Sequence, residues 1–163
     1  MTRITRNTAY VTSGASCLGV TELTGTPNAY AIIANNMLVS ADAGNSNMLT
    51  TPMNIITAKY VKVIFNSIKM TAAERTGIAA ATFGGGVLDS SMFYNNIVSC
   101  FDTSNFAFNF IPTQGSTNYI GYNIYYSRGP LLNKYDGFNC ASLAEWQGHC
   151  AMDGNSQQVN PAF

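Results

Sequence analysis

The chain has 163 residues, no formal net charge and 10% charged residues, against roughly 25% in an average soluble domain. This length suits a single domain, 1–163, with a core large enough to need no metal or disulfide. The eight Lys and Arg residues are scattered along the sequence, which argues against a nucleic-acid-binding protein. Abundant aromatic and aliphatic residues argue against intrinsic disorder.

No segment approaches the roughly 18 consecutive apolar residues of a membrane-spanning helix, and residues 1–14 lack the apolar stretch of a secretory signal. We therefore expect no membrane span and no signal-directed export. Most polar residues are uncharged, chiefly Asn, Thr and Ser, and Gly is also frequent. A surface with so little charge tolerates closely packed neighbours.

An extended N-terminal arm is expected over residues 1–27, with one strand at residues 9–12 (AYVT) between loop-like segments. A globular body follows over residues 28–150. Asn28 can cap a helix, and the apolar spacing in residues 28–39 (NAYAIIANNMLV) predicts a short helix there.

The clearest strand lies in residues 53–68 (MNIITAKYVKVIFNSI), where side chains alternate and β-branched residues are enriched. Thr71 and Glu74 then have the spacing of a capping box, and an alanine-rich run leads to three consecutive glycines. This pattern predicts a helix from Ala72 to Phe83. Residues 88–102 fit either a helix or a strand, and we favour a helix.

An uncharged aromatic ribbon occupies residues 105–126 (NFAFNFIPTQGSTNYIGYNIYY). Phe106, Phe108 and Phe110 share one face of a strand, a PTQGST segment turns the chain, and a second alternating strand returns. The ribbon therefore predicts an antiparallel hairpin with aromatic cross-strand contacts. Its polar face carries no charge that would keep another sheet or chain away.

The C-terminal part begins with residues 141–146 (ASLAEW), which predict one or two helical turns, and ends in a second extended arm, residues 151–163. We find no internal repeat of solenoid or propeller period. The expected fold is α+β and β-rich, with an antiparallel sheet, two or three short helices and extended N- and C-terminal arms.

Catalytic and metal chemistry has little support. The single histidine, His149, is expected on a loop, and adjacent Cys150 cannot easily aim at the same point. A zinc site built from Cys140, His149 and Cys150 with Asp136 would lack the preorganised ligand spacing of such sites. No local pattern pairs two carboxylates. We predict no enzyme, no metal and no cofactor.

Four cysteines, Cys17, Cys100, Cys140 and Cys150, fit buried thiols. Cys140 and Cys150 nevertheless enclose CASLAEWQGHC, a loop that a disulfide could close in an oxidising compartment. Near the end of an Asn- and Thr-rich chain, this pair resembles the C-terminal disulfide loop of type IV pilins. The resemblance implies a pilin-like filament subunit, although the long apolar N-terminal helix of that family is absent.

Tyrosines near the end of the ribbon could stack on sugar rings beside Asn118 and Asn123. The candidate ligand or interface residues are Tyr119, Tyr122, Tyr125 and Tyr126. The alternative use of these rings is packing in the core or at a subunit interface.

Low charge, an unprotected aromatic hairpin and two arms predict a non-enzymatic structural subunit that packs against copies of itself or other subunits. A virion protein of a phage or other virus, such as a capsid, cement or tail component, is the first hypothesis. The alternatives are a carbohydrate- or surface-binding module at the cell surface, and a pilin-like extracellular filament subunit.

Overall fold

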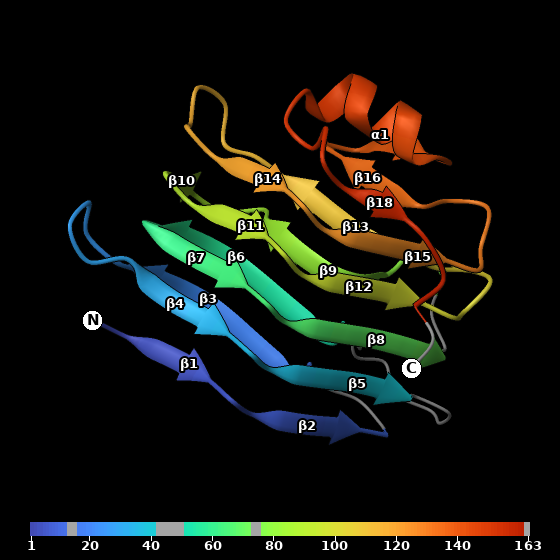
Figure 1. The fold of residues 1–163 in the computed structure, drawn as a ribbon, viewed down its shortest axis with the longest axis horizontal. Coiled ribbons are helices and arrows are strands. Elements are labelled where there is room, and N and C mark those ends of the chain that lie inside the picture. Colours follow the sequence, from blue (N-terminus) through green and yellow to red (C-terminus); the bar gives the residue numbers. More distant parts are fainter. Residues whose placement is uncertain (13–15, 42–50, 73–75, 162–163) are drawn as a thin grey trace.

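The computed structural model describes residues 1–12, 16–41, 51–72 and 76–161. Mostly parallel strands form three sheets, which wind around one interior as a β-solenoid (Figure 1). A typical coil of the chain adds one strand to each of the three sheets, here called A, B and C, and β10 (Leu88–Asp89), β17 (Phe138–Cys140) and β18 (Gln157–Gln158) are short additional strands. In Figure 1 the strands of sheets A and B follow one another nearly in line across the front, and sheet C lies behind them.

Sheet A contains β1 (Arg3–Thr5), β4 (Ala31–Ala34), β7 (Val61–Ile64), β11 (Met92–Tyr94) and β14 (Tyr119–Gly121). Sheet B contains β2 (Thr8–Val11), β5 (Met37–Ala41), β8 (Ser67–Ala72), β12 (Ile97–Cys100), β15 (Ile124–Ser127) and β18 (Gln157–Gln158). Sheet C contains β3 (Leu18–Thr24), β6 (Met53–Lys59), β9 (Ala79–Gly84), β10 (Leu88–Asp89), β13 (Phe106–Ile111), β16 (Asn133–Tyr135) and β17 (Phe138–Cys140).

The interior is built from rows of equivalent apolar side chains, one from each coil. The row from sheet A contains Ile33, Val63, Phe93 and Ile120, and the row from sheet B contains Leu38, Ile68, Val98 and Tyr125. Phe83, Phe108 and Phe110 face them from sheet C, and the rings of Phe93 and Phe108 stack with centroids 4.4 Å apart. Because every row is buried, the coils share one continuous core.

A ladder of asparagines marks the corner between sheets A and B. Asn7, Asn36, Asn66, Asn96 and Asn123 occupy equivalent positions in successive coils. The backbone N–H of each of the first four donates to Oδ1 of the next, at 3.0, 3.1, 3.0 and 2.9 Å. The residue before each ladder asparagine has a positive φ between 55° and 60°, which turns the chain sharply at the corner.

The side-chain amide nitrogens complete the ladder. Asn66 Nδ2 donates to the carbonyl of Ile33 in the preceding coil, at 3.1 Å, and to Oδ1 of Asn96 in the next coil, at 3.0 Å. Asn96 Nδ2 likewise reaches the carbonyl of Val63, at 2.9 Å. Each interior asparagine therefore joins the coils on both sides of it, which fixes the register of the stack.

The expected antiparallel hairpin over residues 105–126 is wrong. Its first strand, β13, lies in sheet C and pairs in parallel with β9 and β16. The returning segment divides into β14 of sheet A and β15 of sheet B. Alternating side chains identify a strand but not its partner, and here the partners lie one coil away in the sequence.

The helices expected over residues 28–39 and 88–102 are strands of successive coils. Of the expected helix 72–83, Ala72 ends β8 and residues 79–83 lie in β9, whereas Glu74 of the proposed capping box lies outside the described residues. Ala79, Ala80 and Ala81 are all buried in sheet C. Packing inside the coil overrides their helix propensity.

The expected N-terminal arm is instead a coil of the solenoid, and the expected absence of a solenoid period is wrong. Residues 1–27 supply β1, β2 and β3, which form the first coil, and β18 near the C-terminus pairs with β15. The expected strand 53–68 is divided among β6, β7 and the start of β8, because Tyr60 and Phe65 turn the chain with positive φ. The β-rich composition of the fold is confirmed.

The helical turns expected at residues 141–146 are confirmed by α1 (Leu143–Cys150). Ser142 caps this helix by accepting the N–H of Glu145, and the carboxylate of Glu145 accepts the N–H of Ala141, the residue before the cap, which is close to a capping box. No helix in the described ranges is long and apolar enough to cross a membrane.

Candidate functional site: the two ends of the solenoid

At the C-terminal end of the solenoid, α1 packs over β16 and β17 and covers the core of the last coil, whereas β14 of sheet A has no described strand on its outer side (Figure 1). Trp146 of this helix is fully buried. Its ring lies edge-on to Phe108, Tyr125 and Tyr135, with centroid distances of 5.8, 6.1 and 6.1 Å. The helix therefore shields the apolar rows of the last coil from water.

The asparagine ladder is also closed at this end. The N–H of Asn123 donates to Ser156 Oγ at 2.7 Å, and the Ser156 hydroxyl donates to Asp153 Oδ1. Trp146 Nε1 donates to the other carboxylate oxygen of Asp153 at 2.6 Å. Burial raises the pKa of Asp153, and the hydrogen bonds from Ser156 and Trp146 oppose that rise. The chain of hydrogen bonds from the last ladder N–H thus ends at the buried carboxyl group of Asp153.

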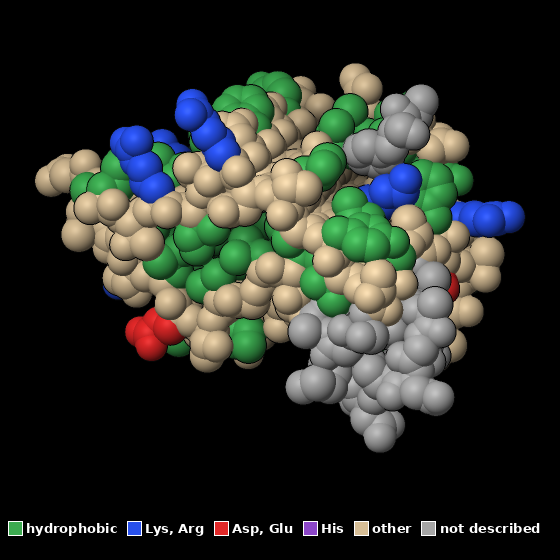
Figure 2. Space-filling view, turned by 90° about the horizontal axis from the view of Figure 1, so that it is seen from below, with side chains coloured by type: hydrophobic (Ala, Val, Ile, Leu, Met, Phe, Trp, Pro, Cys, Tyr) green, Lys and Arg blue, Asp and Glu red, His purple; other side chains and the backbone are tan. Residues whose placement is uncertain are grey.

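The N-terminal end is open. Within the described part of the chain, β1, β2 and β3 each pair with a strand on one side only. A cavity of about 390 Å³ opens there, and Ile4, Ala9, Leu18 and Leu38 are among the residues that line it. Figure 2 views the molecule from this side and shows hydrophobic side chains gathered near the centre of the face.

Asn7 is the unfinished end of the ladder. Its N–H and Nδ2 donate to Asn36 Oδ1 at 3.0 and 2.9 Å. No described group donates to Asn7 Oδ1, whereas Oδ1 of Asn36 accepts both of these bonds. Asn36 Nδ2 also reaches the carbonyl of Ile4, a contact to the preceding coil for which Asn7 has no described equivalent. Asn7 therefore has the geometry of a ladder residue, but the strand that would pair with it on the outer side is missing from the described residues.

The backbone of the first coil is similarly unpaired on one side. In β1, the carbonyl of Thr2 accepts the N–H of Ile32 and the N–H of Arg6 donates to Ala34. Because backbone groups of successive strand residues point to opposite sides, those of Arg3 and Thr5 point away from the solenoid.

The same rule applies to β2. The carbonyl of Asn7 accepts the N–H of Met37, so the backbone groups of Thr8 and Tyr10 point out of the stack. The first coil thus ends in a row of donors and acceptors that no described strand pairs, a surface that natural proteins usually cover or protect.

The charges near the open end are divided between its two faces. Arg3 lies on β1, Arg6 lies at the corner next to Asn7, and both are exposed. Glu22 is exposed on β3 in sheet C. Figure 2 shows Lys and Arg side chains along one side of this end and an acidic side chain on the opposite side.

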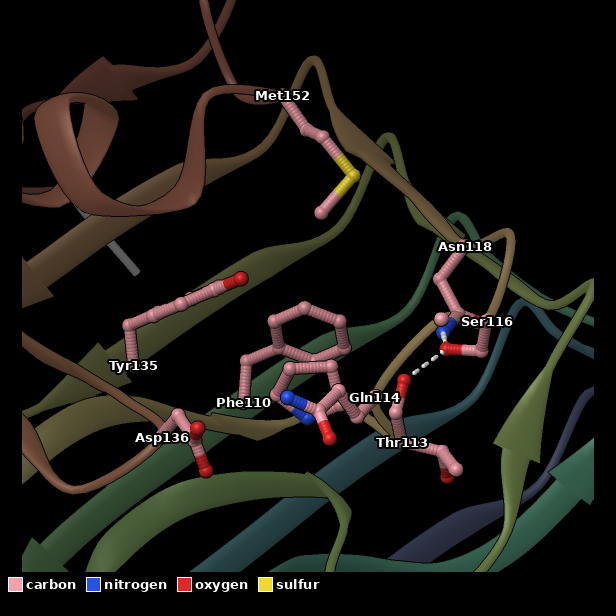
Figure 3. Close-up of a pocket in the computed structure, with 10 residues that line it drawn as sticks. Phe110, Thr113, Gln114, Ser116, Asn118, Tyr135, Asp136 and Met152 are labelled. Atoms are coloured by element: carbon pink, nitrogen blue, oxygen red, sulfur yellow. Dashed lines mark hydrogen bonds between the residues drawn. The ribbon is translucent and has the colours of Figure 1, made fainter.

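A second concave site lies at the opposite end of sheet C, between the β13–β14 loop and the β16–β17 turn (Figure 3). This bowl has a volume of about 550 Å³. Tyr135 supplies its aromatic wall, next to the buried ring of Phe110, and Gln114, Asn118 and Asp136 are among its polar lining residues. No Lys, Arg or His lines it, so the bowl suits a neutral or cationic polar ligand better than an anion.

Comparison with protein-family models, with curated proteins and with solved structures gives no match. The function is therefore inferred from the geometry of the two ends and the bowl.

The structure does not bring the four predicted tyrosines together on one face. Tyr125 is fully buried in the core, and burial raises its pKa well above the usual value. Tyr119 and Tyr122 are exposed on sheet A and at the ladder corner, and Tyr126 lies partly exposed on sheet B. Alternation divides the residues of this strand between two faces but does not say which face is buried. The sequence alone therefore did not identify Tyr125 as an inward residue.

The predicted C-terminal residues lie around the cap. His149 is exposed in the last turn of α1, where its ring stacks on Phe138 at 5.1 Å. Cys140 and Cys150 are buried free thiols. The described residues include no cluster of three His, Cys, Asp or Glu that could hold a metal ion.

The thiols are expected to react slowly in the native protein. Burial raises the pKa of both Cys100 and Cys150 to about 12, and it also raises the pKa of Cys140 and of the half-buried Cys17. Since the thiolate is the reactive form, a thiol reagent at pH 8 should label Cys17 first and the others only after urea is added. Four rapidly labelled thiols in the native chain would contradict this expectation.

The same titration tests the alternative Cys140–Cys150 disulfide. Denatured protein without reductant should yield four thiols if the structure holds in solution, and only two if that bond forms. The pilin-like alternative depends on the second outcome.

Proposed function

We propose that the chain is a non-enzymatic structural subunit that assembles with copies of itself through its open N-terminal coil. The difference between the two ends supports this proposal most strongly. At the C-terminal end, Trp146 of α1 covers the core of the last coil, and the ladder ends at Ser156 and Asp153. The N-terminal coil leaves strand edges, an apolar cavity and Asn7 without a described neighbour.

The physical advantage of such an assembly is twofold. Added strands satisfy backbone donors and acceptors along the free edges of β1, β2 and β3, the mode of recognition called β-augmentation. They also remove the apolar side chains around the cavity, among them Ile4 and Leu18, from water. The two contributions act on the same surface, so one partner can provide both.

We place this subunit in a virion, as a capsid, cement or tail component. The low charge and the Asn- and Thr-rich surface support that location, because such surfaces tolerate dense packing among neighbours.

Tyr10→Pro is the variant that tests the proposed assembly. The N–H of Tyr10 points away from β5, so proline removes an edge donor without breaking the bonds of β2 to β5. We expect light scattering to give a mass above 17.5 kDa for the natural chain and a mass near the monomer for this variant.

Tyr10→Ala is the matched control, because it removes the same exposed side chain and retains the N–H. It should assemble more like the natural chain than Tyr10→Pro does. A natural chain that remains monomeric at all accessible concentrations would overturn the proposal.

A second candidate function is binding of a neutral glycan in the bowl. Its aromatic wall and amide groups favour a sugar, and the absence of basic lining residues disfavours phosphate and carboxylate ligands. Calorimetric titration with neutral oligosaccharides tests this function. Heat that disappears in both Gln114→Ala and Asn118→Ala variants would support the bowl as the site, and no heat in the natural chain would exclude these ligands.

A further inference from the structure

We infer that the partner of the open coil is the same coil of a second copy, placed head to head about a two-fold axis perpendicular to the solenoid. This inference rests on the proposed function and specifies its geometry. The resulting particle is a closed dimer with an α1 cap at each outer end. Four features of the molecule support it, namely the cap, the strand directions, the charges and the unfinished core.

The cap rules out stacking of an open end on a C-terminal end. To accept another coil there, the molecule would have to move α1, expose Trp146 and break the bonds of Asp153 to Trp146 and Ser156. An N-terminal end can therefore meet only another N-terminal end. A two-fold arrangement satisfies this condition and closes the assembly at two copies.

The strand directions are compatible with this arrangement. When the β1–β2 edge faces β3 of the second copy, the pairing across the interface is antiparallel, because β3 runs back across the coil against the direction of β1 and β2 (Figure 1). Antiparallel pairs form between edges without any crossover connection. At the open end, residues 3–11 form one edge and β3 (residues 18–24) forms the opposite edge (Figure 1).

Charge selects between the two possible two-fold axes. One axis places the edge with Arg3 and Arg6 against β3 of the second copy, which carries Glu22, and this contact occurs twice. The other axis places β3 against β3, so that Glu22 meets its own copy while the arginine-bearing edges meet each other. The first axis is electrostatically complementary and the second is not.

The unfinished core and ladder fit the same arrangement. The cavities of about 390 Å³ face each other across the axis, so apolar residues such as Ile4, Ala9 and Leu18 lose their contact with water. The facing β3 edge supplies backbone donors close to Asn7, whose Oδ1 has none from the described residues. One contact thus completes the core and the ladder of both copies.

A charge exchange tests the dimer. The variants are Glu22→Arg and the double change Arg3→Glu with Arg6→Glu, both at exposed positions. Each variant alone places like charges across the two-fold axis, so we expect its dissociation constant to rise about tenfold or more. An equimolar mixture of the two variants restores opposite charges at both contacts and should form a heterodimer about as tight as the natural dimer.

The control keeps the change in net charge and moves it away from the interface. Asn155→Lys with Asn160→Lys adds two positive charges at exposed positions near the capped end, as Glu22→Arg does at the open end. This variant should dimerise like the natural chain. Circular dichroism of every variant checks that the fold is retained.

The outcomes separate this inference from the proposed function. A natural chain at twice 17.5 kDa, weakened by each charge variant and restored in the mixture, supports the head-to-head dimer. An assembly that Tyr10→Pro disrupts but the charge variants leave unchanged, a mixture no stronger than its components, or a mass above two copies overturns the dimer alone. A monomeric natural chain overturns both.

Discussion

Replacing Asn66 with alanine is expected to lower the free energy of unfolding by about 4 kcal/mol, because several buried groups lose their partners together. Asn66 is fully buried, and its Oδ1 accepts the N–H and Nδ2 of Asn36 at 3.1 and 2.9 Å. Its Nδ2 donates to the carbonyl of Ile33 and to Asn96 Oδ1. Alanine leaves these donors and acceptors in the interior without water.

Asn7→Ala is the matched control within the same ladder. Asn7 is exposed and contacts only one ladder neighbour, so its loss should cost about 1 kcal/mol or less. Urea denaturation followed by circular dichroism measures both variants. Equal losses at the two positions would show that the buried ladder contributes no more than its exposed end.

Trp146→Ala is expected to cost about 4 kcal/mol, because it leaves a large cavity beneath the cap. It also deprives the buried carboxyl of Asp153 of its Nε1 donor. Trp146→Phe keeps most of the ring packing against Phe108 and Tyr135 and loses only that hydrogen bond, so its cost should be about 1–3 kcal/mol. Urea denaturation should place the two variants in this order, and a reversal would contradict the assigned role of the ring.

The pH dependence of the free energy of unfolding should reveal the protonation of Asp153 beneath α1. Since burial raises the pKa of Asp153, the protonated carboxyl stabilises the native state below its usual pKa, and this contribution is lost as the pH rises through the raised native pKa. The Trp146 hydrogen bond opposes the raised pKa, so Trp146→Phe should extend the loss to higher pH. Asp153→Asn should remove this component of the pH profile, and an unchanged profile would contradict it.

The sequence contains the solenoid period in a form that is easy to overlook. The ladder asparagines lie 29, 30, 30 and 27 residues apart, but their coils otherwise share only apolar character at the inward positions. The ladder rows would have appeared if residues 33–38, 63–68 and 93–98 had been aligned on these asparagines. Strand content and α1 were predictable because they depend on local patterns.

Strand partners and corners could not be read from local patterns. Phe65 and Tyr122 adopt positive φ at the ladder corner, although bulky residues seldom do so. Only the stacked coils make that conformation favourable. The same reason explains why residues 105–126 suggested a hairpin, since alternation is identical whether the next strand pairs directly or after a full coil.

The candidate site was less predictable than the fold. An open end exists only after the coils have closed, so no segment of residues 1–27 identifies it by itself. Asp153 stands in a DGNS segment that is typical of a turn, yet it closes the ladder through Ser156 three residues later. A DGNS segment gives little warning of this role, because Trp146, which completes the site, comes from α1.

The position of α1 has a consequence for incomplete copies of this chain. Ribosomes make the N-terminal edge first and the cap last, and a protease that cuts before Ala141 removes the cap from a finished molecule. Either product carries an exposed coil at both ends instead of one. Such a two-ended fragment can add further fragments indefinitely, in the manner of a fibril. The segment from Ala141 onward, which contains α1, therefore decides whether this fold ends a stack or propagates one.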